Sequence, residues 1–222
     1  PSPPAPRPQH SGDHPIGAGF RRLYHTARQL PRYRQLLVFL FAFWIYNDGI
    51  GTIIKMSTAY GDQIGLQIDH MIAALVLSQF VGIPCTFAFG WLARYTGAKK
   101  AILLGLAVYI ATSTGAYFMT NTLHFFILAG LIGVIQGGTQ GLSRSLFASM
   151  VPQKQATEFF GFFSTSSKFA GIFGPLLFGL VNDYTGGGRI SILSLIAFFA
   201  VGGAKLNTEG LLLKGIAAFG RK

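Results

Sequence analysis

Long apolar stretches fill most of this chain, and short polar segments separate them. Most of the stretches reach the ~20 apolar residues that an α-helix needs to cross a bilayer, and the last is marginally short. No remaining segment is long enough to form a separate soluble domain. We therefore predict an all-α membrane protein with six transmembrane helices, at residues 35–60, 70–93, 100–120, 123–147, 157–181 and 190–206.

Basic residues gather on one side of these predicted spans. The loops on the other side contain Arg189 alone, together with Asp62, Asp69 and Asp183. This asymmetry follows the positive-inside rule, so we expect both termini in the cytoplasm and the protein in the plasma (inner) membrane. The residues that set this orientation are Arg7, Arg21, Arg22, Arg28, Arg32, Arg34, Arg94, Lys99, Lys100, Lys154, Lys205, Lys214, Arg221 and Lys222.

The composition agrees with a membrane protein. The chain is 50% hydrophobic and 11% charged, and it has 29 glycines, which are common where helices pack in lipid. A net charge of +11 would point to nucleic acid in a soluble protein. Here membrane topology explains the charge, so we expect the lipid bilayer and no nucleic acid as a partner. Cys85 is the only cysteine, which excludes an internal disulfide, and we predict neither a metal nor a cofactor.

The sequence divides into a linker, a bundle and a tail. Residues 1–34 form a cytoplasmic linker that begins with a proline-rich stretch. Within it, residues 19–30 place apolar side chains at helical spacing with basic ones on other faces. That pattern suits either a short amphipathic helix on the anionic leaflet or a solvated basic linker. Residues 35–206 form the transmembrane bundle and residues 207–222 a cytoplasmic tail.

Polar residues near the middle of several spans carry the functional prediction. An ionised side chain at the centre of a spanning helix costs about 2.5–3.5 kcal/mol on insertion scales. We therefore expect Asp48 and Lys168 to pair, or to line one hydrated cavity. An ion pair that only fixes helix register is the alternative. The residues that we predict along a solute path are Asn47, Asp48, Gln79, Gln136, Gln140 and Lys168.

Three further charged residues lie nearer the span ends. Lys55 follows Asp48 by about two helical turns on the same face, where it suits either snorkelling or function. Arg144 lies near the cytoplasmic end of the fourth span. Glu158 opens the fifth span, where a carboxylate suits the positive end of the helix dipole. We predict that Arg144 and Glu158 belong to a cytoplasmic gate, and a contact between them is one arrangement that the sequence allows.

A short internal echo indicates two inverted three-helix repeats. In the first and fourth spans, an amide is followed two residues later by glycine and eight residues later by a basic residue. These spans cross in opposite directions, as the first helices of inverted units do. The matching positions are Asn47, Gly49 and Lys55 in the first span, and Gln136, Gly138 and Arg144 in the fourth.

Two local motifs resemble those of the major facilitator superfamily. The segment from Gly90 to Lys100, Gly-Trp-Leu-Ala-Arg-Tyr-Thr-Gly-Ala-Lys-Lys, is similar to its cytoplasmic gating loop, although Arg94 stands where the family usually has Asp. The segment Gly171-Ile172-Phe173-Gly174-Pro175 resembles its glycine–proline motif, in which small residues permit close packing and proline bends the helix. The resemblance implies gating roles for Gly90, Arg94, Gly97, Lys99 and Lys100, and helix-packing roles for Gly171, Gly174 and Pro175.

Three longer segments resemble a narrower branch, the autophagy-linked vacuolar amino-acid effluxers. They are Tyr46-Asn47-Asp48-Gly49, the segment 136–145 and the segment 158–164. The resemblance covers about residues 17–204 and fits best the carboxy-terminal six-helix half. It implies a secondary transporter that moves a small polar solute, amino acids among the candidates, by alternating access, with or without a coupled proton. We expect a fragment, a split gene product or a half that needs the missing amino-terminal half or a second copy.

Two other classes of protein remain open at this stage. The chain can be a membrane component that binds a partner and transports nothing. It can also be an intramembrane enzyme, but the sequence has neither a His-Glu-x-x-His zinc motif nor a Gly-x-Ser-x-Gly elbow. We therefore predict that it is not an enzyme.

Overall fold

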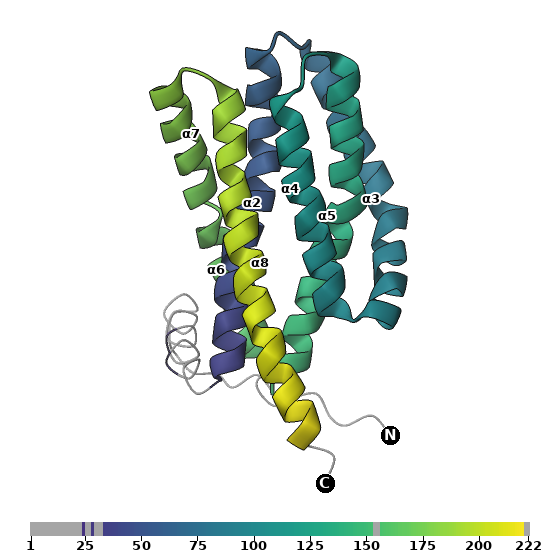
Figure 1. The fold of residues 1–222 in the computed structure, drawn as a ribbon, viewed down its shortest axis with the longest axis vertical. Coiled ribbons are helices and arrows are strands. Elements are labelled where there is room, and N and C mark those ends of the chain that lie inside the picture. The colour runs from purple at the N-terminus through teal and green to yellow at the C-terminus, as the bar shows by residue number, and fades with distance from the viewer. Residues whose placement is uncertain (1–23, 25–27, 29–32, 153–155, 220–222) are drawn as a thin grey trace, which may run out of the picture.

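The computed structural model describes residues 24, 28, 33–152 and 156–219 (Figure 1). The proline-rich linker and most of the predicted amphipathic helix lie outside the described residues. Within the described part every regular element is an α-helix, as predicted. The helices are α2 (Arg34–Gln63), α3 (Ile68–Thr96), α4 (Ala98–Tyr117), α5 (Thr122–Met150), α6 (Ala156–Ala170), α7 (Phe173–Thr185) and α8 (Gly188–Phe219).

Five of the described helices are long and apolar enough to cross a membrane. They are α2, α3, α4, α5 and the Gly188–Asn207 part of α8. The first four predicted spans and the sixth therefore each correspond to one helix. Helix α8 continues to Phe219, so the segment predicted as a tail begins as a helical extension of the last span.

The fifth predicted span, 157–181, is wrong as one continuous helix. It consists of α6, with 15 residues, and α7, with 13 residues, separated at Gly171 and Ile172. Pro175 explains the position of the break, because its ring has no N–H and clashes with the carbonyl four residues earlier, which is that of Gly171. The proline therefore lies in the first turn of α7, where it is tolerated, and does not bend a longer helix.

The helices form one upright bundle (Figure 1). Helix α3 packs against α5, α4 lies between α5 and α8, and α2 contacts α8, α7 and α6. A cluster of aromatic rings joins α2, α5 and α6. The ring centroid of Phe163 lies 4.4 Å from that of Phe43 and 4.5 Å from that of Phe147. Aromatic burial of this kind fixes α6 against the rest of the bundle.

Glycine allows α3 and α5 to approach closely. A Cβ atom at Gly133 would lie 2.5 Å from the carbonyl oxygen of Ser78, and one at Gly137 would meet Thr86 and lie 3.2 Å from the carbonyl oxygen of Gly82. The spacing of Gly133 and Gly137 is the small-xxx-small pattern of membrane helix pairs. The contact therefore depends on backbone meeting backbone.

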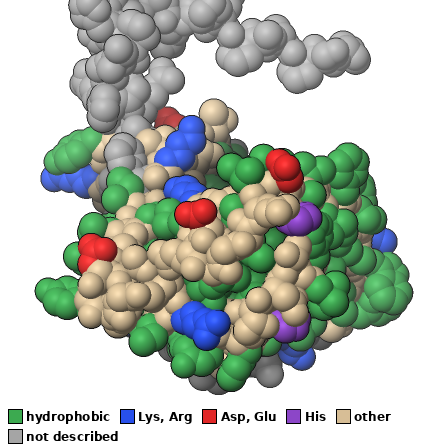
Figure 2. Space-filling model, turned by 90° about the horizontal axis from the view of Figure 1, so that it is seen from above, with side chains coloured by type: hydrophobic (Ala, Val, Ile, Leu, Met, Phe, Trp, Pro, Cys, Tyr) green, Lys and Arg blue, Asp and Glu red, His purple; other side chains and the backbone are tan. Residues whose placement is uncertain are grey.

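The surface of the bundle matches a membrane environment. Only 17% of the most apolar window of α3 is buried inside the protein, whereas 56% of that of α2 is buried. Figure 2 looks onto the end that carries the α2–α3 and α7–α8 connections, with hydrophobic side chains around the rim and polar and charged groups across the end. An apolar circumference with a polar end is what a membrane-embedded bundle requires.

Candidate functional site

The break between α6 and α7 lies beside the middle of α2. A helix end leaves backbone carbonyls or N–H groups without partners inside the helix, and a break leaves both kinds close together. At membrane depth such groups need partners from protein or from a water-filled cavity. Two charged side chains of α2 supply partners here.

Asp48 binds the N-terminal end of α7. It lies near the centre of α2 and its side chain is 3% exposed. Its Oδ2 accepts a hydrogen bond of 2.7 Å from the backbone N–H of Gly174, whereas the N-cap residue Ile172 supplies no side-chain cap. A carboxylate at this end also complements the positive end of the helix dipole. Asp48 thus caps α7 from a neighbouring helix.

Lys55 binds the C-terminal end of α6. Its Nζ donates a hydrogen bond of 3.3 Å to the carbonyl oxygen of Gly171, just after the last residue of α6. Its positive charge complements the negative end of that helix. Lys55 also interacts electrostatically with Asp48. The two residues of α2 thus match the two ends of the broken helix in sign.

Gly174 permits this contact. A Cβ atom at this position would meet Oγ1 of Thr52 and lie 3.0 Å from Oδ1 of Asp48. The Thr52 hydroxyl donates a hydrogen bond of 2.7 Å to the carbonyl oxygen of Asp48, which holds it in place. Any larger residue at position 174 would therefore separate α7 from the Asp48 carboxylate.

One oxygen of Asp48 has no partner. Oδ1 is buried and accepts no hydrogen bond. Buried carboxylate oxygens normally have partners, because the loss of hydration is otherwise uncompensated. The unpartnered oxygen makes this carboxylate chemically distinct from a purely structural cap.

A cavity of about 420 Å³ lies beside Asp48, between α2, α6, α7 and α8. The indole Nε1 of Trp44 donates a hydrogen bond of 3.1 Å to Oγ of Ser166 across it. Its other walls are mainly aromatic. The lining residues are Phe41, Trp44, Ile45, Asp48, Ser166, Phe173 and Phe198.

The predicted ion pair between Asp48 and Lys168 is wrong in this structure. Asp48 binds the Gly174 amide, and Lys168 is exposed near the end of α6 and does not line the cavity beside Asp48. The reason is the helix break, which gives Asp48 a backbone donor that a continuous helix would not offer. Lys55, and not Lys168, is the cation that interacts with Asp48.

The other predicted solute-path residues lie at or near the surface of the described bundle. Asn47, Gln136 and Gln140 are half-buried, and Gln79 is exposed. None of them lines the cavity beside Asp48. Their assignment to a solute path stays a prediction.

Within the predicted gating loop only Gly97 lies outside a helix, because α3 ends at Thr96 and α4 begins at Ala98. It ends α3 and precedes α4 with a φ of +85°, a conformation that favours glycine. Its N–H donates to the carbonyl oxygen of Ala93 at 2.9 Å. Lys99 donates a hydrogen bond of 2.7 Å to the carbonyl oxygen of Asn207, which ties the start of α4 to α8. The loop is therefore attached to the last span.

The remaining predicted gate residues lie apart. Gly90 is half-buried, and Arg94 and Lys100 are exposed. Arg144 and Glu158, both within the described residues, are also exposed, and no ion pair joins them. The contact considered between these two residues is therefore not formed here. The gating roles stay predictions.

The sequence did not reveal a contact between two of its motifs. The hydroxyl groups of Tyr46 and Ser143 share a hydrogen bond of 2.7 Å, and both residues are buried. Ser143 also donates to the carbonyl oxygen of Thr139. Both residues belong to segments that carry the resemblance, but nothing in the sequence pairs them. This bond links α2 to α5 two residues from Asp48.

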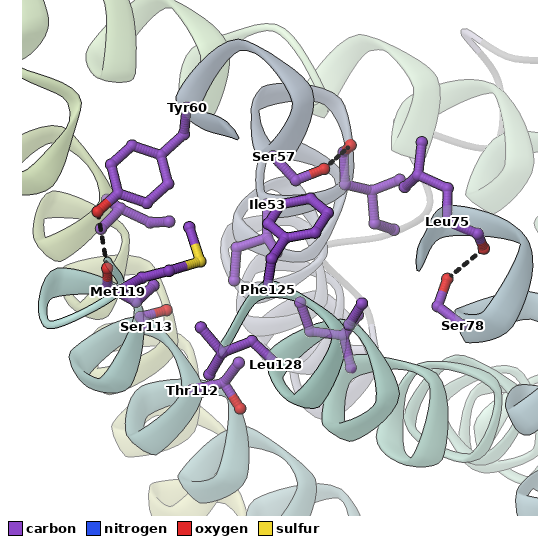
Figure 3. Close-up of a pocket in the computed structure, with 15 residues that line it drawn as sticks. Ile53, Ser57, Tyr60, Leu75, Ser78, Thr112, Ser113, Met119, Phe125 and Leu128 are labelled. Atoms are coloured by element: carbon purple, nitrogen blue, oxygen red, sulfur yellow. Dashed lines mark hydrogen bonds between the residues drawn. The ribbon is translucent and has the colours of Figure 1, made fainter. Parts of the chain in front are cut away.

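A second cavity, of about 50 Å³, is enclosed among α2, α3, α4, α5 and α8 (Figure 3). Its walls are mainly apolar. The hydroxyl groups of Ser57 and Ser78 donate to the backbone of their own helices and not across the space. Ser113 is buried there without a hydrogen-bond partner. This cavity offers few polar groups to a solute, in contrast to the Asp48 region.

Comparisons with known proteins show the family of the chain. The family model described as "Vacuole effluxer Atg22 like" matches residues 1–206. An uncharacterized MFS-type transporter of Bacillus subtilis, YxiO, is 43% identical over 190 residues, which cover 85% of this chain and 44% of that protein. Autophagy-related protein 22 of Eremothecium gossypii is 28% identical over 82% of this chain and 38% of its own length. The chain spans less than half the length of these relatives.

Proposed function

Because the chain belongs to the family of Atg22-like vacuole effluxers, we propose that it is one six-helix half of a secondary transporter that moves a small polar solute by alternating access. In this proposal α6 and α7 together make the fifth crossing along the chain, which brings the total to six. The half is the carboxy-terminal one. It lies in the plasma (inner) membrane, and both of its termini are in the cytoplasm.

The observation that carries the proposal is the interrupted helix at the middle of the bundle. Secondary transporters place solute and ion sites at discontinuous helices near the bilayer midplane, where half-helix ends offer backbone groups. Here the ends of α6 and α7 meet a lysine and an aspartate of α2. A membrane protein that served only as a scaffold would have no need for this arrangement, because an uninterrupted helix satisfies its own backbone groups in lipid.

The exposed polar residues support a missing second half. Asn47, Gln136 and Gln140 lie partly uncovered, and Gln79 and Lys168 are exposed. Polar groups at membrane depth face a bundle interior or a water-filled cavity. A second six-helix unit, either an amino-terminal half or another copy, would cover them and complete a solute path. The relatives, which are more than twice as long as the matched region, contain room for such a unit.

Amino acids are the solute class that we propose. Lys168 offers a cation for a carboxylate, and the amides of Asn47, Gln136 and Gln140 offer both donors and acceptors for the remaining polar groups. Asp48 supplies the carboxylate for coupling to a cation. The family is described as vacuole effluxers, which supports transport out of a compartment.

The test is amino-acid transport by the full-length protein in proteoliposomes with an imposed pH gradient. We expect Lys168→Ala to weaken uptake mainly through KM and Asp48→Asn to remove the dependence on the gradient. Asp69→Asn is the matched control, because Asp69 is an exposed carboxylate at the start of α3. If Asp48→Asn and Lys168→Ala both leave uptake and its pH dependence intact, the proposal is wrong.

A further inference from the structure

We propose that Asp48 is a binding site for one proton, and that its protonation loosens the hold of α2 on the junction between α6 and α7. This deepens the proposed function, because it names the coupling ion and the part of the protein that responds to it. The inference rests on the junction geometry, and its test does not require transport.

The two oxygens of the carboxylate have different surroundings. Oδ2 accepts the bond from the Gly174 amide, whereas Oδ1 is buried without a partner. The backbone of Gly174 and the side chain of Thr52 pack beside Oδ1 so closely that even a methyl group at position 174 would not fit. In this proposal the proton binds Oδ1, because Oδ2 already accepts the bond from the Gly174 amide.

The cavity beside Asp48 gives the proton a route. At about 420 Å³ it has room for several water molecules. Ser166 lies in its wall and adds a hydroxyl group to an otherwise aromatic lining. Asp48 forms part of its wall, and its Oδ1 atom is buried just behind that wall.

Few charges among the described residues face Asp48. Lys55 of α2 is the charged side chain that interacts with it, and α7 contributes the positive end of its dipole through Gly174. The neighbours from α6 and α8 in the cavity wall, Ser166 and Phe198, are uncharged. Gln63 of α2 also binds Asn182, near the other end of α7. The attraction that holds the N-terminal end of α7 to α2 therefore depends mainly on the negative charge of Asp48.

Protonation removes that charge. A hydrogen bond to an ionised carboxylate is stronger than one to its neutral form, and the interaction with the helix dipole disappears with the charge. The N-terminal end of α7 is then held less tightly, while Lys55 still binds the carbonyl of Gly171 at the end of α6. The expected result is a junction whose α7 side opens at low pH.

Hydrogen exchange measured by mass spectrometry tests this on the full-length protein in nanodiscs. Peptides that cover residues 171–176 are compared between pH values after correction for intrinsic exchange. We expect the corrected exchange to rise by roughly tenfold as Asp48 becomes protonated, the size of effect that loss of a charged hydrogen bond produces. Asp48→Asn should exchange fast at every pH, whereas Asp69→Asn should keep the pH response.

The internal reference is the connection at residues 64–67, which should show no such response. A flat profile at 171–176 in the unaltered protein overturns the inference even if Asp48→Asn fails to fold. A pH response that persists in folded Asp48→Asn also overturns it. Transport with a flat exchange profile would keep the proposed function and reject the proton site. A normal exchange response without transport would keep the proton site and reject the proposed function.

Discussion

The α3–α5 contact and the contact of α2 with α6 and α7 both use glycine to bring helices close, but different forces stabilise them. Between α3 and α5, Gly133 and Gly137 let backbone meet backbone, and the hydroxyl groups nearby bond within their own helix. Between α2 and the α6–α7 junction, a buried carboxylate and a lysine bind two helix ends. The first contact contains no charge, and the second depends on charge.

This difference separates a fixed part of the bundle from an adjustable one. Backbone packing through glycine has no titratable group, so its strength does not respond to a proton or a solute. Helix ends held by charged side chains respond to any change in those charges. We therefore expect substitutions in the α3–α5 contact to affect folding, and substitutions at the junction to affect pH dependence as well.

The largest effect is expected for Gly133→Leu. Its side chain would collide with the backbone of Ser78, which cannot move without separating α3 from α5. Overpacking costs typically about 1–3 kcal/mol, and a collision with backbone belongs at or above the upper end. Gly130→Leu is the control, since nothing lies within 4 Å of a Cβ at that position. Equal unfolding free energies of the two variants in mixed micelles would contradict the close α3–α5 contact.

A smaller effect is expected for Gly174→Ala. The methyl group would displace Thr52 and the Asp48 carboxylate, and the hydrogen bond to residue 174 would lengthen or break. We expect a loss of about 2 kcal/mol of unfolding free energy, in the range for a bond to a charged group.

Gly179→Ala in the same helix is its control, because no atom lies within 4 Å of a Cβ there. The pair is compared at two pH values. If the difference between the variants is the same at both, the junction does not depend on the charge of Asp48.

Lys55→Met should have a smaller effect again. The lysine is exposed and its bond to the carbonyl of Gly171 is long, so we expect a loss of about 0.5–1 kcal/mol from the helix-dipole interaction. Lys55→Arg should restore most of it. Exchange of the amides in the last turn of α6 measures the effect, and an unchanged rate in Lys55→Met would show that the lysine does not hold that end.

The smallest effect is expected for Tyr46→Phe. It removes the bond to Ser143, but the Ser143 hydroxyl keeps its bond to the carbonyl of Thr139 and the ring stays packed. We expect a loss of about 0.5 kcal/mol, at the low end for a neutral hydrogen bond and independent of pH. Thermal unfolding in detergent measures it. A larger loss that varies with pH would place Tyr46 in the responsive part of the bundle.

The sequence alone predicted most of the fold. The length of the apolar stretches predicted the helices α2, α3, α4, α5 and the first part of α8, because in lipid only a helix satisfies every backbone group locally. The motifs predicted the family. The presence of Asp48 at the middle of α2 also pointed to a functional site. The apolar length, the motifs and the position of a charged residue are each properties of one segment. The sequence of that segment is therefore enough to predict them.

The sequence did not predict the partners of Asp48. The sequence offered Lys168 as the obvious cation, since it is charged and lies within the fifth predicted span. The structure instead gives Asp48 a backbone amide of α7 and an electrostatic interaction with Lys55. A backbone donor carries no mark in a sequence, because every residue except proline has one.

Two prolines show what the sequence alone could not decide. Pro84 and Pro175 both occur within predicted spans, and each prevents one helical hydrogen bond. Either residue can therefore interrupt a helix. Helix α3 continues through Pro84, whereas the fifth span separates into α6 and α7 before Pro175. Only the tertiary structure decided between these outcomes, because a break inside a membrane requires partners for two helix ends, and α2 supplies them at Asp48 and Lys55.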